Sequence, residues 1–222
     1  MENLRKMGLP IQDVLQFVTG RVTPDRSVLV GIDGGAGSGK TTFAHWLAER
    51  IRETTTPVSI VHTDDFCRPS AERVNHQFPL ARVSDIDWKR LRDYVIVPLR
   101  SGKTARFQLY DWPADCLRDW VTIDVGGVTI IDGVTATRNE LSDYYDLRIW
   151  FSCPRNIRVS RMLGRGDTSA AEIEHWMPSE DHYIASHAPE RTAHLVVDSA
   201  ADMATRDGNG WFTTWWSPPS AA

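Results

Sequence analysis

Two kinds of apolar pattern alternate along the chain and predict strands separated by helices. Short runs of β-branched and other apolar residues are typical of buried strands and occupy 26–33, 57–62, 128–131, 147–152 and 194–198. Apolar positions at helical spacing predict helices over 9–18, 40–53, 87–99, 154–163 and 170–187. This alternation indicates an α/β fold with helices on both faces of a mainly parallel sheet, a three-layer arrangement.

The remaining segments carry weaker patterns. Residues 68–84 contain prolines and polar residues and are expected to form a loop, and Asp87 is a plausible N-cap for the helix that follows. Short strands are expected over 106–110 and 120–124 around a turn at Trp112-Pro113. The tail from residue 207 onward shows no usable period.

Length and composition narrow the function classes. A chain of 222 residues with 41% hydrophobic content fits a single domain over 1–222, with a core at 27–200 and a tail at 201–222. The formal charge of -4 provides no basic surplus for nucleic acid. The three cysteines lack paired spacing, which predicts reduced thiols. No apolar run of membrane-spanning length and no signal segment is found, so we expect a cytoplasmic protein. The sequence leaves the oligomeric state open.

A glycine-rich segment lies between the first predicted strand and the next helix. Residues 34–41 read Gly-Gly-Ala-Gly-Ser-Gly-Lys-Thr and match G-x-x-x-x-G-K-[ST]. Backbone N–H groups of such a loop, with the helix N-terminus behind them, bind phosphate. Lys40 can reach the β- and γ-phosphates of ATP and the Thr41 hydroxyl can ligate Mg²⁺. The candidate nucleotide-binding residues are Gly34, Gly35, Ala36, Gly37, Ser38, Gly39, Lys40, Thr41 and Thr42.

Acidic residues follow two other predicted strands. Asp64 and Asp65 come after residue 62, and Asp132 ends the strand at 128–131. The carboxyl ends of parallel strands share one edge, so these groups should converge near the phosphate loop. A kinase needs one carboxylate to accept a hydroxyl proton and others to hold Mg²⁺ directly or through water, which makes Asp64 and Asp132 candidate metal-holding groups. Turn chemistry is the alternative, especially for Asp65, and His62 is interpreted as a packing residue.

Four arginines follow the fourth predicted strand. Arg155, Arg158, Arg161 and Arg165 have spacings that place them near one helical face. A solvated basic face is one interpretation; the other is a set of cations that close over a transferring phosphoryl group. Glycines on both sides of Arg165 would let the region 158–168 move as a lid.

Five segments in a fixed order resemble the uridine kinase and phosphoribulokinase group of P-loop kinases, with nicotinamide riboside kinases as relatives. The resemblance covers about three quarters of the chain, from Val30 to Asp198. Its motifs are GIDGGAGSGKTT (31–42), HTDDF (62–66), LRSGKTARFQLYDW (99–112), IIDG (130–133) and RVSRMLGRGD (158–167).

The resemblance implies roles for individual residues. It implies that Asp64 is the catalytic base and that Asp132 helps to hold Mg²⁺. It places Tyr110 in the acceptor pocket, with Trp112 where phenylalanine is usual. Lid arginines that act in catalysis correspond to Arg161 and Arg165, and Arg158 is a candidate for the acceptor side; these roles imply an ATP- and Mg²⁺-dependent kinase of a nucleoside-like hydroxyl compound.

Two departures from the resemblance bear on the acceptor. The histidine expected after the Y-D-aromatic motif is missing, and Asp115 stands near its place. The segment Leu80–Asp87 lacks the aspartate that would bind ribose. A kinase for a sugar, vitamin precursor or antibiotic therefore stays open, as does a nucleotide-hydrolysing switch, although no N/T-K-x-D guanine motif is present.

Overall fold

A computed structural model describes residues 7–8, 11–73, 83–166, 168–200 and 212–216. Its main sheet has the order β1-β9-β8-β7-β2-β6-β3. The strand bounds are β1 Met7–Gly8, β2 Val28–Gly34, β3 Val58–His62, β6 Val128–Asp132, β7 Leu147–Ser152, β8 Leu195–Asp198 and β9 Phe212–Trp216. Strands β2, β3, β6, β7 and β8 pair in parallel, which confirms the predicted sheet.

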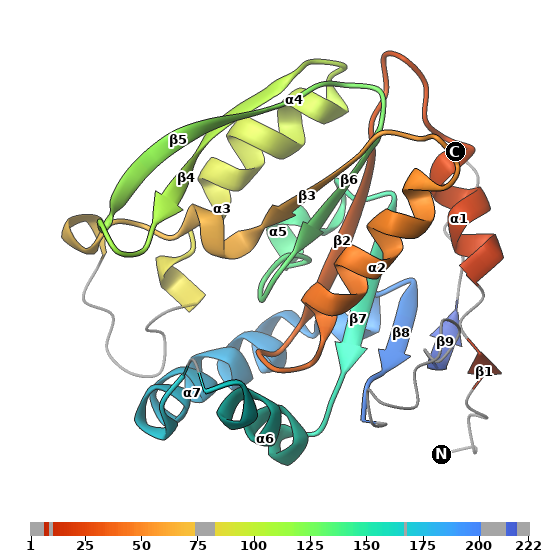
Figure 1. Ribbon diagram of the computed structural model, residues 1–222. Helices are drawn as coiled ribbons and strands as arrows, with labels where there is room; N and C mark the ends of the chain where they lie inside the picture. The colour runs from red at the N-terminus through yellow and green to blue at the C-terminus, as the bar shows by residue number, and fades with distance from the viewer. Residues whose placement is uncertain (1–6, 9–10, 74–82, 167, 201–211, 217–222) are drawn as a thin grey trace.

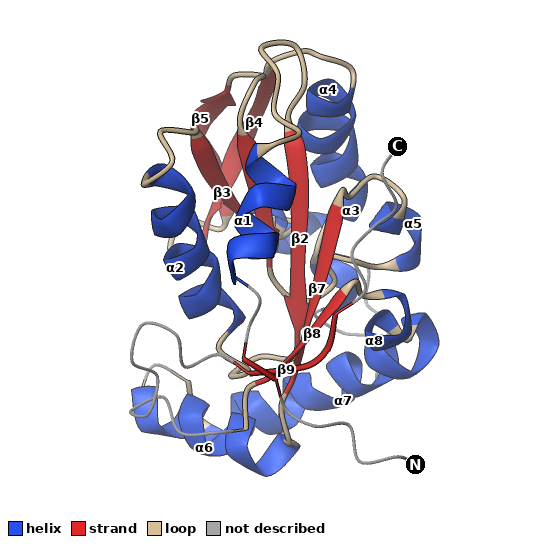
Figure 2. Cartoon of the chain, turned by 90° about the vertical axis from the view of Figure 1, so that its right-hand side faces the viewer, coloured by secondary structure: helices blue, strands red, loops and turns tan. Residues whose placement is uncertain are grey.

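Helices cover both faces of this sheet (Figures 1 and 2). The bounds are α1 Ile11–Thr19, α2 Lys40–Arg52, α3 Trp88–Leu91, α4 Val97–Arg100, α5 Asn139–Ser142, α6 Arg155–Arg165, α7 Ala170–His187 and α8 Pro189–Thr192. A π-helical segment, η4 (Arg92–Ile96), joins α3 to α4, so the helix predicted at 87–99 is confirmed with Asp87 as its N-cap. The three-layer α/β class is confirmed; a lid at 158–168 stays a prediction.

Two apolar clusters hold the layers together. One packs α1 and α2 on one sheet face, with Phe43 of α2 and Phe151 of β7 in ring contact at 5.1 Å. The other packs the α3–η4–α4 helix and a hairpin on the opposite face. Strand β2 has all seven residues buried, as expected for the central strand of such a sheet.

The expected hairpin is present and longer than predicted. Strand β4 (Ala105–Asp111) pairs antiparallel with β5 (Cys116–Ile123), with a bulge between Gln108 and Tyr110. Three short 3₁₀ turns, η1 (Thr63–Phe66), η2 (Ser70–Glu72) and η3 (Val83–Asp85), lie in the connection from β3 to α3.

The sequence analysis predicted no strand in the tail from residue 207 onward, because that segment shows no period. In the structure, β9 pairs antiparallel with β8, and β1 pairs antiparallel with β9 at the edge of the main sheet. Helices α5 and α8 were also missed; each has four residues, too few to show a helical period. None of the helices in the described ranges combines the length and apolarity that a bilayer-spanning segment needs.

Candidate active site

The glycine-rich segment forms a tight turn between β2 and α2. Gly37 and Gly39 adopt φ values of 78° and 91°, which side-chain-bearing residues rarely reach. A Cβ atom on Gly37 would lie 2.5 Å from the carbonyl oxygen of Arg158, so the loop also needs glycine for close packing. The turn leads into the N-terminus of α2, the geometry that favours phosphate.

Lys40 and Thr41 begin α2 and line a cavity beside the loop. Lys40 is 9% exposed, and the Thr41 hydroxyl donates a hydrogen bond of 2.7 Å to Oδ2 of Asp132. The structure thus brings the loop threonine and the aspartate of β6 together, as their positions at neighbouring strand ends predicted.

The register of β3 and β6 sets His62 opposite Asp132. Nδ1 of His62 lies 3.2 Å from Oδ2 of Asp132, and this hydrogen bond raises the pKa of His62 against the opposing effect of burial. Oδ1 of Asp132 is buried and has no hydrogen-bond partner among the described residues. His62 therefore contacts the site through Asp132, whereas the sequence analysis interpreted it as a packing residue. Its position at the end of a strand, directly before Thr63, was the signal that could have identified it.

The two aspartates of η1 differ in environment. Asp64 is exposed, lines the cavity and makes no side-chain hydrogen bond to another residue in the described part of the chain. Asp65 accepts the backbone N–H of His62 at 3.3 Å, and burial raises its pKa. The Asp64 carboxylate is therefore open to the cavity, whereas Asp65 is engaged at the end of β3.

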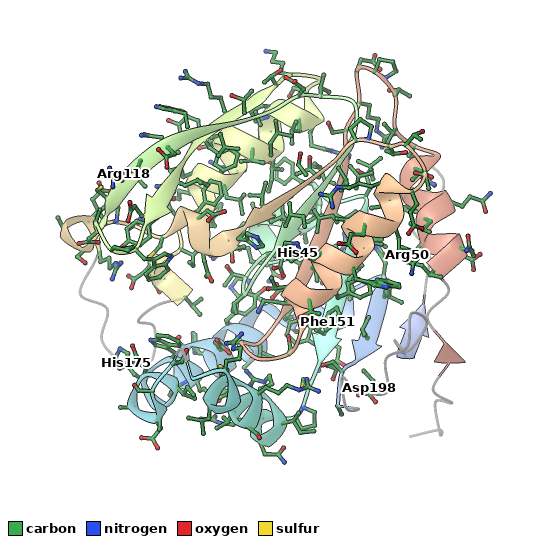
Figure 3. All side chains as sticks on the ribbon, in the orientation of Figure 1. His45, Arg50, Arg118, Phe151, His175 and Asp198 are labelled. Carbon is green, nitrogen blue, oxygen red and sulfur yellow. The ribbon has the colours of Figure 1, made fainter. Side chains whose placement is uncertain are left out.

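The cavity measures about 420 Å³, a size that accommodates small ligands. It collects Lys40, Thr41, Asp64, Asp132 and Arg165 from four segments of the chain. In Figure 3, Asp198 at the carboxyl end of β8 and His175 on α7 both lie toward the end of the sheet where the strands stop and α6 and α7 lie.

Nine predicted site residues lie outside the described lining of this cavity: the loop residues Gly34, Gly35, Ser38, Gly39 and Thr42, and, away from the loop, Tyr110, Trp112, Arg158 and Arg161. Nη2 of Arg161 donates to the carbonyl oxygen of Ser199 at 2.8 Å. Trp112 is 48% exposed and packs edge-on against Tyr110. Of the segment expected to bind ribose, residues 80–82 lie outside the described residues.

Tyr110 and Arg158 are buried in other contacts. The Tyr110 hydroxyl donates to Oδ1 of Asp115 at 2.6 Å and accepts from Nη2 of Arg73 at 2.8 Å. Arg158 is 5% exposed and packs against the phosphate loop, where Nη1 lies 3.0 Å from Oε2 of Glu180. Its guanidinium therefore contacts the nucleotide side of the site, although the acceptor side was expected.

Two buried carboxylates near the loop were not anticipated. Oε2 of Glu180 accepts the backbone N–H of Ala36 at 3.1 Å, which ties α7 to the phosphate loop. Asp33 is fully buried and accepts hydrogen bonds from Gly34, Thr135, Thr137 and the Tyr183 hydroxyl. Burial raises the pKa of Asp33, although the hydrogen bonds that it accepts act in the opposite direction. The sequence signal was an acidic residue inside an otherwise apolar strand.

The arrangement of a phosphate-binding turn, a lysine and threonine on the following helix and carboxylates at adjacent strand ends defines a P-loop kinase of small molecules. The chain belongs to the phosphoribulokinase / uridine kinase family, whose model matches residues 29–206.

Individual relatives agree with this assignment. A uridine kinase of Halobacterium salinarum is 29% identical over 190 residues, which are 79% of this chain and 82% of that protein. A structure described as a possible uridine kinase from Bacillus stearothermophilus has a TM-score of 0.64 at 22% identity and covers 84% of this chain and 96% of its own. A D-glycerate 3-kinase from Cryptococcus neoformans has a TM-score of 0.59 at 12% identity, covering 96% and 94% of the two chains, and shares the fold.

Proposed function

We propose that this kinase transfers the γ-phosphate of ATP, with Mg²⁺, to a hydroxyl group of a nucleoside-like small molecule. The observation that carries the proposal is the single cavity lined by Lys40, Thr41, Asp64 and Asp132. Phosphoryl transfer needs positioning and charge stabilisation, with a carboxylate at the acceptor hydroxyl, and these residues have the corresponding chemistry.

The residues fit a magnesium ion. Thr41 and Asp132 would hold it, because their oxygens are 2.7 Å apart and Oδ1 of Asp132 is a buried carboxylate oxygen without a described partner. Bound Mg²⁺ usually keeps several waters and phosphate oxygens as ligands, so two protein groups suffice. Such an ion would neutralise charge on the phosphates.

The protein's own groups then have distinct tasks. Asp64 orients the acceptor hydroxyl and accepts its proton as the new O–P bond forms. Lys40 and Arg165, both in the cavity lining, stabilise the negative charge on the transferred group. Arg161 would have to break its hydrogen bond to the carbonyl oxygen of Ser199 to act beside Lys40 and Arg165. Movement of the proposed lid would allow this.

The acceptor is less well defined than the phosphate donor. Uridine kinase relatives support a nucleoside-like compound, whereas the absent histidine and ribose-binding aspartate favour a broader set of hydroxyl compounds. The hydrogen bond between Tyr110 and Asp115 supports this second candidate, because neither residue is among the described residues that line the cavity.

Asp64→Asn tests the proposal. Loss of the base should reduce phosphorylation of the acceptor by roughly 10²–10⁴-fold while ATP affinity changes little. ADP release is measured with and without a panel of nucleosides, sugars and vitamin precursors, and mass spectrometry identifies a product heavier by one phosphate. Asp119→Asn, an exposed aspartate of β5 that does not line the cavity, is the matched control.

The contrary result is equally clear. Phosphorylation of no compound in the panel, together with ATP hydrolysis by the Asp64→Asn protein at the wild-type rate, would mean that the site serves a nucleotide-hydrolysing switch. The kinase mechanism proposed for Asp64 would then be abandoned.

A further inference from the structure

A second cavity with cationic walls adjoins the first. It measures about 470 Å³ and shares Val83 and Ser179 with the cavity at the phosphate loop. Its wall is formed by the β3–α3 connection, the start of α3, the loop after β6 and one side of α7. The remaining lining residues are Arg68, Ser84, Trp88, Lys89, Arg138, His182, Tyr183, Ser186 and His187, which with the shared pair we call the basic pocket.

The described residues that line the basic pocket include three permanent cations and no carboxylate. Two of the cations have partners behind the wall: Arg68 lies 3.1 Å from Asp87, and Arg138 lies 2.8 Å from Glu140. Lys89 has no carboxylate partner in the described ranges of the chain. Among the described residues, the charge of Lys89 is therefore the part of the pocket's positive charge that no carboxylate pairs with.

Arg138 is held in place before any ligand arrives. Two of the cations lie near the Trp88 ring, with the Arg138 guanidinium 4.8 Å and the Lys89 ammonium 5.7 Å from its centroid. The second Arg138–Glu140 hydrogen bond, at 2.9 Å, fixes the plane of that guanidinium. A preorganised cation loses little side-chain entropy when it binds an anion.

A histidine adds a donor to this wall. Nδ1 of His187 accepts the backbone N–H of Asn139 at 3.2 Å, which places the ring proton on Nε2 in the neutral form. Burial and the neighbouring Arg138 lower the pKa of His187, so the neutral form prevails at pH 7. Neutral His187 can donate one hydrogen bond without charge.

We propose that the basic pocket binds an anionic group, a phosphate ester or a carboxylate, on the molecule whose hydroxyl is phosphorylated. The shared wall at Val83 and Ser179 lets one small molecule present its hydroxyl at Asp64 and its anionic group at Lys89 and Arg138. The inference rests on the proposed function in that it takes the first cavity as the acceptor site. It narrows the acceptor to hydroxyl compounds that carry an acidic group.

Binding measured in the presence of saturating MgADP tests this, because the nucleotide occupies the phosphate loop. Isothermal titration calorimetry of the full chain compares ribose 5-phosphate with ribose, glycerol 3-phosphate with glycerol, and gluconate with sorbitol, with inorganic phosphate as the smallest probe. The acidic member should bind roughly tenfold or more tightly than its neutral partner. Comparison of the phosphate and carboxylate pairs identifies which anion the pocket selects.

Variants locate the anion. Lys89→Gln combined with Arg138→Gln should abolish the preference, whereas Lys103→Gln removes the same charge at an exposed position outside the pocket and should retain it. Unchanged MgADP binding shows that the double variant is folded, and the single Lys89→Gln change at an exposed side chain provides a second, milder test.

Three results would overturn the inference: equal binding of acidic and neutral partners, no binding of any anionic probe, or a preference that survives in the double variant. Phosphorylated product is assayed separately. An anion preference, with no product from these compounds or from the wider panel and with wild-type ATP hydrolysis by Asp64→Asn, would refute the proposed function and leave the basic pocket as a binding site. Product from neutral compounds alone, with equal binding of acidic and neutral partners, would support the proposed function and overturn the inference about the basic pocket.

Discussion

Arg158 and Glu180 form a buried ion pair beneath the phosphate loop, and its removal is a strong test of how the loop is held. Both side chains are 6% exposed, and the pair is 3.0 Å long. Each partner also contacts the loop. Glu180 accepts the backbone N–H of Ala36 at 3.1 Å, and Nη1 of Arg158 donates to the carbonyl oxygen of Ala36 at 3.3 Å. The pair thus satisfies both backbone polar groups of one loop residue.

The size of the effect depends on which partners remain. Arg158→Met leaves the Glu180 carboxylate buried without its cation, which typically costs about 3–5 kcal/mol of unfolding free energy. Against a total of roughly 5–15 kcal/mol this is severe, and it corresponds to a Tm lowered by about 6–20 °C for a chain of this size. Glu180→Leu should cost less, because Asp181 remains 3.9 Å from Nη2 of Arg158 and still compensates part of its charge.

The double variant separates folding from binding. Arg158→Met with Glu180→Leu replaces the pair by apolar side chains and should recover most of the stability, since such replacements are often neutral or stabilising. Ala36 still lacks its acceptor and its donor, so the Kd for MgADP should stay about tenfold or more above wild type.

Urea unfolding and calorimetric titration of MgADP measure the two quantities on the same four proteins. If the losses of the single variants simply add in the double variant, Arg158 and Glu180 are not a coupled pair and the reasoning fails. Wild-type MgADP affinity in the double variant would instead show that the loop does not need these contacts.

Three further outcomes are expected. Lys40→Ala should reduce ATP-dependent turnover by roughly 10²-fold or more with an unchanged circular dichroism spectrum, because Lys40 stabilises charge in the transition state. Asp132→Asn should raise the Mg²⁺ concentration for half-maximal rate, measured by ADP release. Burial and the nearby Arg148 guanidinium lower the pKa of His194 to about 4. The folded state thus favours the neutral imidazole, and this contribution to the free energy of unfolding is present above pH 6.5 and is lost as the pH falls toward 4. In urea titrations His194→Gln should reduce this loss, on the order of 1–3 kcal/mol, and the exposed His45→Gln should not.

Local pattern was sufficient for the central strands and the phosphate loop. Strand β7 occupies the predicted 147–152, and α2 begins at the predicted Lys40, because burial on both faces and a strand–turn–helix motif leave their mark within a few residues. Strand β9 was missed because its pairing with β8 is a non-local contact and its register shifts between Val196 and Val197.

The site divides in the same way. The convergence of Lys40, Thr41, Asp64 and Asp132 on one cavity was predictable, because each lies at or shortly after the carboxyl end of a parallel strand. Glu180 was not predictable, since it contacts Ala36 across 144 positions of the chain through the packing of α7. The sequence of α7 around Glu180 does not indicate whether this carboxylate binds a loop or lies in water.

In the Y-D-aromatic motif, the hydroxyl of Tyr110 makes hydrogen bonds to other residues of the protein. Burial and the hydrogen bond to Asp115 raise the pKa of Tyr110 to about 12, so the hydroxyl remains a donor near neutral pH. Asp115 also accepts the backbone N–H of Ser70 at 2.9 Å, which joins the hairpin to the β3–α3 connection. These groups are thereby committed to holding the hairpin against that connection. If the proposed function holds, recognition of the acceptor falls to other side chains, and the cations of the basic pocket, Lys89 and Arg138 among them, are the groups that we propose for it.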